Sequence, residues 1–105
     1  MNKILVSLVA AGAALAFQTS HAATGEELYQ TKGCVACHAI DAQRVGPSYQ
    51  AVAEKHAGEA DAVATLANHI KNGSAGVWGV IPMPPNNVTE EEATVLAEWV
   101  LTQKP

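Results

Sequence analysis

Two cysteines and a histidine at fixed spacing constrain this chain more than any other feature. Cys34, Cys37 and His38 form a Cys-x-x-Cys-His stretch, and the chain contains no other cysteine. This spacing is typical of covalent haem attachment, in which each thiol forms a thioether and the histidine binds the iron. A redox dithiol would come with a βαβ pattern, and a zinc site with a second Cys/His pair; the sequence has neither. We therefore expect one covalently bound haem c.

The first 22 residues have the pattern of a secretory signal peptide. A polar, positive start precedes an apolar run over residues 4–17 that is too short to span a bilayer. A small-x-small cleavage pattern ends at Ala22. We expect residues 1–22 to be removed, leaving one domain over residues 23–105 in the periplasm with no membrane insertion. A retained membrane anchor is the less favoured alternative, because no stop-transfer pattern follows.

The expected mature chain is small and acidic. It keeps all ten acidic residues and five of the six basic ones. An acidic surface disfavours nucleic acid as a partner, because the phosphate backbone is itself negative. A domain of this size buries little apolar surface and usually needs a covalent cross-link or a bound cofactor to be stable. A haem tied to the chain at two points would supply one, so we expect the haem-free chain to be marginally stable or unfolded.

The domain is predicted to be all-α. Capping-box patterns open a helix after Thr24 that ends near Thr31, and a final helix after Thr89. Two further helices are expected over residues 48–56 and 60–72, each with a glycine just beyond its end. Alternating runs of β-branched residues are absent, so strands are not expected.

The sixth position of the iron decides between electron transfer and catalysis, and Met83 is its favoured ligand. It is the only methionine of the expected mature chain and lies in the Gly- and Pro-rich segment 73–87. A lone methionine is more often core filler. Three flanking prolines, however, stiffen the backbone and allow one side chain to be presented rigidly. The competing ligands are His56 and His69, both expected to be partly exposed residues in or at the end of helices.

These features together resemble the small bacterial class I c-type cytochromes of the cytochrome c-551 type. The similarity extends over essentially the whole expected mature chain. It is carried by residues 32–41, 45–47, 71–74, 76–79 and 81–86. The resemblance implies the cytochrome c fold, with about four helices and loops wrapped around one covalently bound haem. It also implies that Cys34 and Cys37 form the thioethers and that His38 and Met83 are the axial pair.

The resemblance further implies roles for residues around the haem. The carbonyl of Pro47 would accept a hydrogen bond from the axial imidazole, which fixes its tautomer and raises its basicity. The indole of Trp78 would donate to a haem propionate, although plain core packing is the alternative. The side chain of Asn86 would lie near the sulfur of Met83.

Two positions depart from the family's usual pattern. His69 stands where members often carry an arginine that bonds a propionate, so the surroundings of that propionate are expected to be sensitive to pH. Arg44 stands where the best-known members carry an apolar residue near the exposed haem edge. This second departure concerns the docking face and not the fold.

The implied function is that of a single-haem electron carrier in the periplasm, not an enzyme. It would pass one electron between respiratory redox proteins, toward a terminal reductase or oxidase. Partners are expected to dock transiently around residues 81–85, Val35 and Ala36, and the protein is expected to be a monomer. Two alternatives stay open: a haem enzyme or gas sensor in which Met83 is labile, and a haem module docked permanently in a larger complex.

Overall fold

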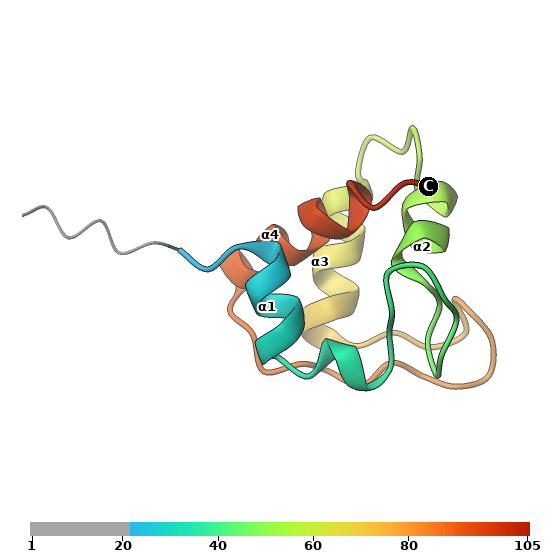
Figure 1. The fold of residues 1–105 in the computed structure, drawn as a ribbon, viewed down its shortest axis with the longest axis horizontal. Coiled ribbons are helices and arrows are strands. Elements are labelled where there is room, and N and C mark those ends of the chain that lie inside the picture. The colour runs from blue at the N-terminus through green and yellow to red at the C-terminus, as the bar shows by residue number, and fades with distance from the viewer. Residues whose placement is uncertain (1–21) are drawn as a thin grey trace, which may run out of the picture.

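The computed structural model describes residues 22–105 and builds them from four α-helices and one short 3-10 helix (Figure 1). In chain order these are α1 (Gly25–Thr31), η1 (Cys34–Ala36), α2 (Tyr49–Lys55), α3 (Ala62–Asn72) and α4 (Glu90–Leu101). The all-α prediction is confirmed for this part of the chain, where the one β-type pairing is an isolated antiparallel bridge between Ser74 and Met83. No helix within these residues is long and apolar enough to cross a membrane. The expected signal peptide falls on residues outside the described ones, apart from Ala22, and stays a prediction.

Side-chain caps explain where three of the helices begin. At α2, Oγ of Ser48 accepts from the N–H of Ala51 at 3.1 Å. At α4, Oγ1 of Thr89 accepts from the N–H of Glu92 and the Glu92 carboxylate accepts from the N–H of Thr89, both at 3.0 Å, which completes the expected capping box. At α1 only half of the expected box forms, because Oγ1 of Thr24 accepts from the N–H of Glu27 at 3.2 Å without a return bond. Helix α3 begins at Ala62 and not at residue 60 as expected.

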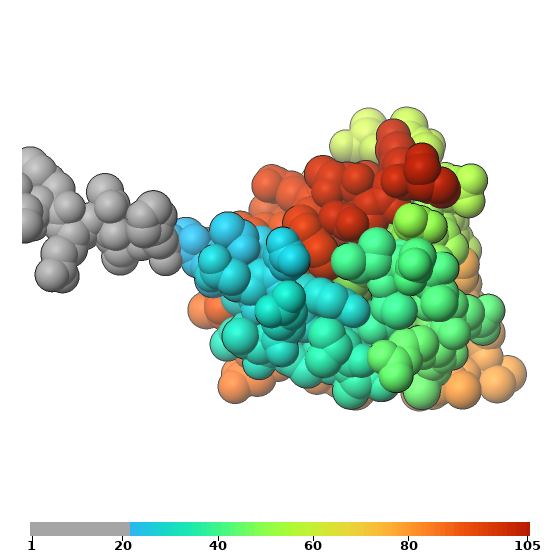
Figure 2. All heavy atoms as spheres, in the orientation of Figure 1, coloured from blue at the N-terminus to red at the C-terminus, as the bar shows by residue number. Residues whose placement is uncertain are grey.

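Helix α4 is the centre of the fold. Helices α1, α2 and α3 each pack against it, and their side chains also meet beside it, as where the rings of Tyr29 on α1 and Tyr49 on α2 lie with centroids 5.4 Å apart. The buried face of α4 consists of residues spaced as one helical stripe, namely Ala93, Leu96, Ala97 and Val100. Figures 1 and 2 show α4 crossing the molecule with its outer side exposed and its C-terminal end close to α2.

The buried core is divided into two clusters that meet on α4. One joins α2, α3 and α4 and consists of Tyr49, Val52, Leu66, Ala97 and Val100. The other joins α1 to α4 and consists of Leu28, Val88, Ala93 and Leu96. Neither cluster fills the space between α2, α3 and the loops over residues 37–48 and 74–84, and that space forms the cavities described below.

The capping box is expected to make stability depend on pH. The pKa of the Glu92 carboxyl is lowered, chiefly by the N–H of Thr89 and also by the positive charge of Lys32, whose Nζ lies 3.7 Å from Oε2. A carboxyl whose pKa is lower in the folded than in the unfolded state stabilises the fold above its unfolded pKa. That contribution is lost as the pH falls through the folded value.

We therefore expect Glu92→Gln to lose less stability than the wild type as the pH falls from about 5 to about 3, a range that spans the usual pKa of glutamate. Glutamine can still accept the hydrogen bond of the cap, so the variant isolates the charge. Urea denaturation at several pH values measures the two slopes. Glu91→Gln, an exposed neighbour in the same turn, is the matched control, and identical slopes for the two variants would contradict the prediction.

Candidate functional site

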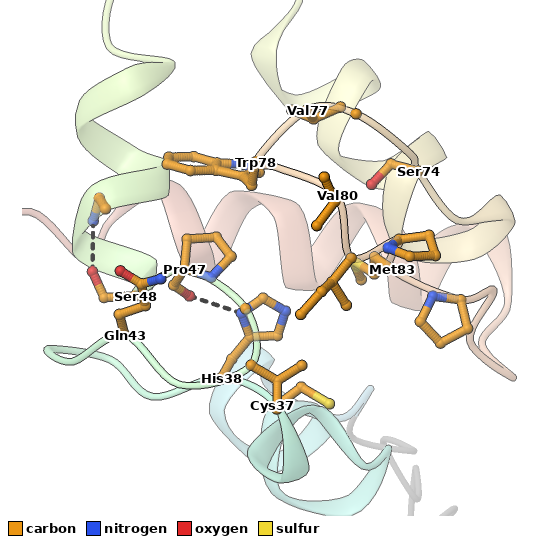
Figure 3. A pocket seen from close by; sticks show the side chains of 17 residues that line it. Cys37, His38, Gln43, Pro47, Ser48, Ser74, Val77, Trp78, Val80 and Met83 are labelled. Atoms are coloured by element: carbon orange, nitrogen blue, oxygen red, sulfur yellow. Dashed lines mark hydrogen bonds between the residues drawn. The ribbon is translucent and has the colours of Figure 1, made fainter.

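Most of the residues selected from the sequence line two adjoining cavities. The larger, of about 480 Å³, lies between residues 37–48, the beginning of α2 and the loop over residues 74–84. The smaller, of about 60 Å³, lies against α2, α3 and α4. Three residues line both of them: His38, Ser74 and Met83. The two expected axial ligands thus lie where the cavities meet, and Figure 3 shows them reaching that space from different segments of the chain.

The imidazole of His38 is held in one orientation. Its Nδ1 lies 2.8 Å from the carbonyl oxygen of Pro47 (Figure 3). Because a carbonyl can only accept, Nδ1 carries the proton and donates it, which leaves the lone pair of Nε2 available for a metal. The ring of Tyr49 stacks on the imidazole with centroids 5.0 Å apart, and the hydroxyl of Tyr29 donates to the carbonyl of His38 at 3.1 Å. The side chain and the backbone of His38 are therefore both fixed.

No side chain fits at Gly46, beside this ring. A Cβ atom there would lie 2.8 Å from Nδ1 and 3.0 Å from Nε2 of His38. The ring cannot yield cheaply, because Pro47 holds its Nδ1 and Tyr49 packs on its face. We expect Gly46→Ala to displace the imidazole and to lower the free energy of unfolding of the haem-loaded protein by about 1–3 kcal/mol. Denaturant titration followed by haem absorbance measures this loss against Val45→Ala at the exposed neighbouring position; equal midpoints would show that the segment relaxes around the added methyl group.

The two cysteines lie on one tight turn that also carries His38. In η1 the carbonyl of Cys34 accepts from the N–H groups of Cys37 and His38, at 3.2 and 2.9 Å. Cys34 is buried and lines the smaller cavity, whereas Cys37 is half-buried and lines the larger one. Burial raises the pKa of the Cys34 thiol, which makes it a poor nucleophile in the folded chain. A single turn thus presents two thiols and an imidazole to the same space.

Met83 is positioned by hydrogen bonds at the two ends of its loop. Its N–H donates to the carbonyl of Ser74 at 2.9 Å, and its own carbonyl accepts from the N–H of Ser74 at 3.0 Å. Gly73 ends α3 with a φ of 85°, and a Cβ atom there would lie 2.8 Å from the carbonyl oxygen of Met83, so glycine is required on both counts. Beyond the prolines, Nδ2 of Asn86 donates to the carbonyl of Ile70 on α3 at 2.8 Å. Both ends of the Met83 segment are therefore tied to α3.

The other candidate residues separate into two groups. Trp78 lines the larger cavity and is 44% exposed, and half-buried His69 lines the smaller one. His56 lines neither cavity and is only 6% exposed, with Nδ1 2.7 Å from the carboxylate of Glu59. The expectation of a partly exposed His56 is wrong, because the chain turns back after α2. In this turn the N–H of Glu59 donates to the carbonyl of His56, which places the Glu59 carboxylate beside the imidazole.

Sequence comparison matches residues 22–104 to the family profile described as Cytochrome c. The chain belongs to the cytochrome c family. It is similar to cytochrome c-551 of Stutzerimonas stutzeri, with 59% identity over 104 residues that cover 99% of this chain and 100% of that protein. It is 62% identical to cytochrome c-551 of Ectopseudomonas mendocina over 82 residues, which cover 78% of this chain and 100% of that protein. Wild-type cytochrome c552 of Nitrosomonas europaea superimposes with a TM-score of 0.73 at 48% identity, covering 75% of this chain and 99% of that one.

These matches confirm the cytochrome c fold and the resemblance to cytochrome c-551. Membership of the cytochrome c family implies one covalently bound haem c and makes this protein a small haem electron carrier. The residues present fit that group. Two thiols, one imidazole with its Nε2 free and one thioether sulfur surround cavities lined largely by apolar side chains, and these are the donors that attach and ligate haem in this family. Gly46 and Gly73 keep the side chains of His38 and the Met83 segment close to that space.

Proposed function

We propose that this cytochrome c is a periplasmic one-electron carrier and not an enzyme, with its haem attached through Cys34 and Cys37 and ligated by His38 and Met83. The observation that carries the proposal is the position of His38 and Met83, which come from segments far apart in the sequence and line both cavities. If His38 and Met83 both bind the iron, no ligand position would be left for a substrate.

The chain's own residues would set the balance between the two oxidation states. When bound, the haem supplies an iron that cycles between ferrous and ferric. The thioether of Met83, a weak donor, would favour the ferrous state and raise the reduction potential. The carbonyl of Pro47 accepts a hydrogen bond from Nδ1–H of His38, which increases the basicity of the imidazole and fixes its ring. Because both ligands are held by the backbone, electron exchange would require little rearrangement.

Polar side chains around the cavities are assigned to haem positioning. Trp78 and His69 would donate to the propionates; the partial exposure of Trp78 at the cavity wall supports a polar role over core packing. Asn86 would support the ligand loop, since its Nδ2 donates to the carbonyl of Ile70 at 2.8 Å and lies 3.4 Å from that of Pro84.

An apolar surface at the mouth of the larger cavity supports transient docking of a redox partner. Exposed apolar side chains, ranging from 38% to 98%, gather in this part of the molecule: Val35, Val45, Trp78, Val80 and Ile81. All except Val35 line the cavity. Exposed apolar patches of this kind mark interaction sites, and small interfaces suit short-lived electron-transfer complexes. We propose that respiratory partners dock here and that the protein acts as a monomer.

Export to the periplasm is supported by the charged start, apolar run and cleavage pattern of residues 1–22. The E. mendocina relative matches 82 residues that make up its whole length, close to the extent of residues 23–105. Mass spectrometry of the haem protein from a periplasmic extract tests the boundary. The expected N-terminus is Ala23, and an intact residue 1 would contradict cleavage of the signal peptide.

Spectroscopy separates the carrier from an enzyme. The ferric protein should show the absorption band of sulfur–iron ligation and keep it when peroxide is added, with no peroxide turnover. Loss of the band together with turnover would identify a haem enzyme with a labile methionine. Gel filtration of the native extract adds a second test, because a haem module docked permanently in a complex would elute far above the size of a monomer.

Arg44 places a positive charge beside the apolar docking surface. Its Nη1 donates to the carbonyl of Val35 at 3.3 Å. A charge at the rim of an interface mainly steers association. We expect Arg44→Met to leave spectrum and potential almost unchanged and to slow electron exchange with an acidic-faced partner about two- to fivefold at low salt. The difference should shrink as ionic strength approaches roughly 0.15 M. Stopped-flow rates over a salt series, with Arg44→Lys as control, measure this; equal rates with every partner at low salt would leave Arg44 as a solvated surface residue.

A further inference from the structure

The loop that carries Trp78 and leads to Met83 is closed at its ends but weakly held between them. Ser74 and Met83 exchange two backbone hydrogen bonds. Within residues 22–105, the backbone of residues 75–82 makes no hydrogen bond to another backbone group. Val80 in this loop is 98% exposed. A segment with so few buried contacts opens readily unless a side chain holds it.

One side chain from α2 reaches this loop. Lys55, in the last turn of α2, donates from Nζ to the carbonyl of Val77 at 3.3 Å. This is the one hydrogen bond made by the backbone of residues 75–82 within the described chain. The same ammonium group lies 4.6 Å from the centroid of the Trp78 ring, within the distance of about 6 Å at which a cation is attracted to an aromatic face.

These two contacts involve consecutive residues of the loop. A carbonyl and a ring face that share one ammonium group are fixed relative to each other and to α2. Ala51 of α2 lines the larger cavity together with Val77 and Trp78. The lysine therefore spans the side of the cavity where α2 faces the loop.

We propose that Lys55 is a positioning residue that holds the 75–82 loop against α2 and thereby keeps Met83 in place. This inference rests on the proposed role of Met83 as a ligand. Without the lysine, the loop can swing about the Ser74–Met83 pair and take Trp78 away from the cavity. The two hydrogen bonds of that pair would then open more often, and the sulfur of Met83 would leave its position more often.

The experiment compares three variants of the haem-loaded protein. Lys55→Met keeps the length and apolar stem of the side chain but removes the charge and the donor. Lys55→Arg keeps the charge, the donor and the attraction to the indole ring. Lys104→Met removes the same charge from an exposed position near the C-terminus and is the matched control. Amide hydrogen exchange is measured at Ser74 and Met83, with Leu96 in α4 as the reporter of global unfolding. The rate of cyanide binding to the ferric protein measures departure of the sulfur.

We expect Lys55→Met to raise amide exchange at Ser74 and Met83, and the rate of cyanide binding, by about tenfold each, with exchange at Leu96 unchanged. Lys55→Arg and Lys104→Met should stay within about twofold of the wild type. Equal rates in Lys55→Met and Lys104→Met, or an equal rise at Leu96, would overturn the proposal. A wild-type protein without the sulfur–iron band would instead overturn the ligand assignment of Met83, while amide exchange at Ser74 would still test the hold of Lys55 on the loop.

Discussion

Replacing Met83 with alanine should lower the reduction potential by on the order of 0.1–0.3 V, a part of the range of roughly 0.8 V over which axial ligands set haem potentials. The substitution removes the thioether that favours ferrous iron. Water or a nearby imidazole would take its place, and His69 lines the same small cavity. The sulfur–iron absorption band of the ferric protein should disappear. Protein-film voltammetry and the ferric spectrum measure the two effects.

Ile81→Ala is the matched control for this variant. It shortens an exposed side chain in the same loop, 64% accessible, without touching the sulfur or the Ser74–Met83 hydrogen bonds. Its potential and its sulfur–iron band should stay close to those of the wild type. If Met83→Ala kept both the potential and the band, Met83 would not be the ligand.

Removing both thioether sites should leave a chain that does not fold. In the double variant Cys34→Ser, Cys37→Ser no covalent bond to haem can form. The two core clusters meet on α4, and the cavities of about 480 and 60 Å³ separate the remaining elements. Without covalently attached haem, a domain of this size buries too little apolar surface to offset the entropy lost on ordering the chain.

Far-ultraviolet circular dichroism of the haem-free double variant at 25 °C tests this prediction. We expect a spectrum with little helix and no cooperative melt. The single variant Cys37→Ser is the control, because it can keep one thioether at Cys34 and should retain most of the helical signal. A native-like, cooperative melt of the haem-free chain would show that folding does not depend on covalently attached haem.

The helices could be predicted from the sequence because their causes are local. Thr89 and Glu92 are three positions apart and form their capping box within one turn. Gly73 follows the last turn of α3 and adopts the positive φ that ends it. The expected start of α3 was less accurate, since Asp61 provides no side-chain hydrogen bond there. The Cys-x-x-Cys-His turn is local in the same sense, so its residues also lie together as the spacing implies.

The contacts that arise from packing could not be predicted in this way. The burial of His56 depends on the turn that follows α2, and no periodic pattern marks that turn. Tyr49 stacks on His38 because α2 returns past the turn that carries Cys34 and Cys37, which depends on the path of the whole chain. Lys55 contacts Val77 across 22 positions of sequence, and neither residue belongs to a motif from which this contact could be predicted.

The packing of α1, α2 and α3 on one common helix leaves the fold incomplete until α4 is in place. Helix α4 comes last in the chain, and without it the earlier helices lack the surface on which each of them packs. Helices of seven residues, such as α1 and α2, are unstable alone. Leu96 and Val100 of α4 line the same small cavity as Cys34. The thiol that the finished fold buries is therefore exposed as long as α4 has not docked, so we expect haem to be attached before α4 closes over it.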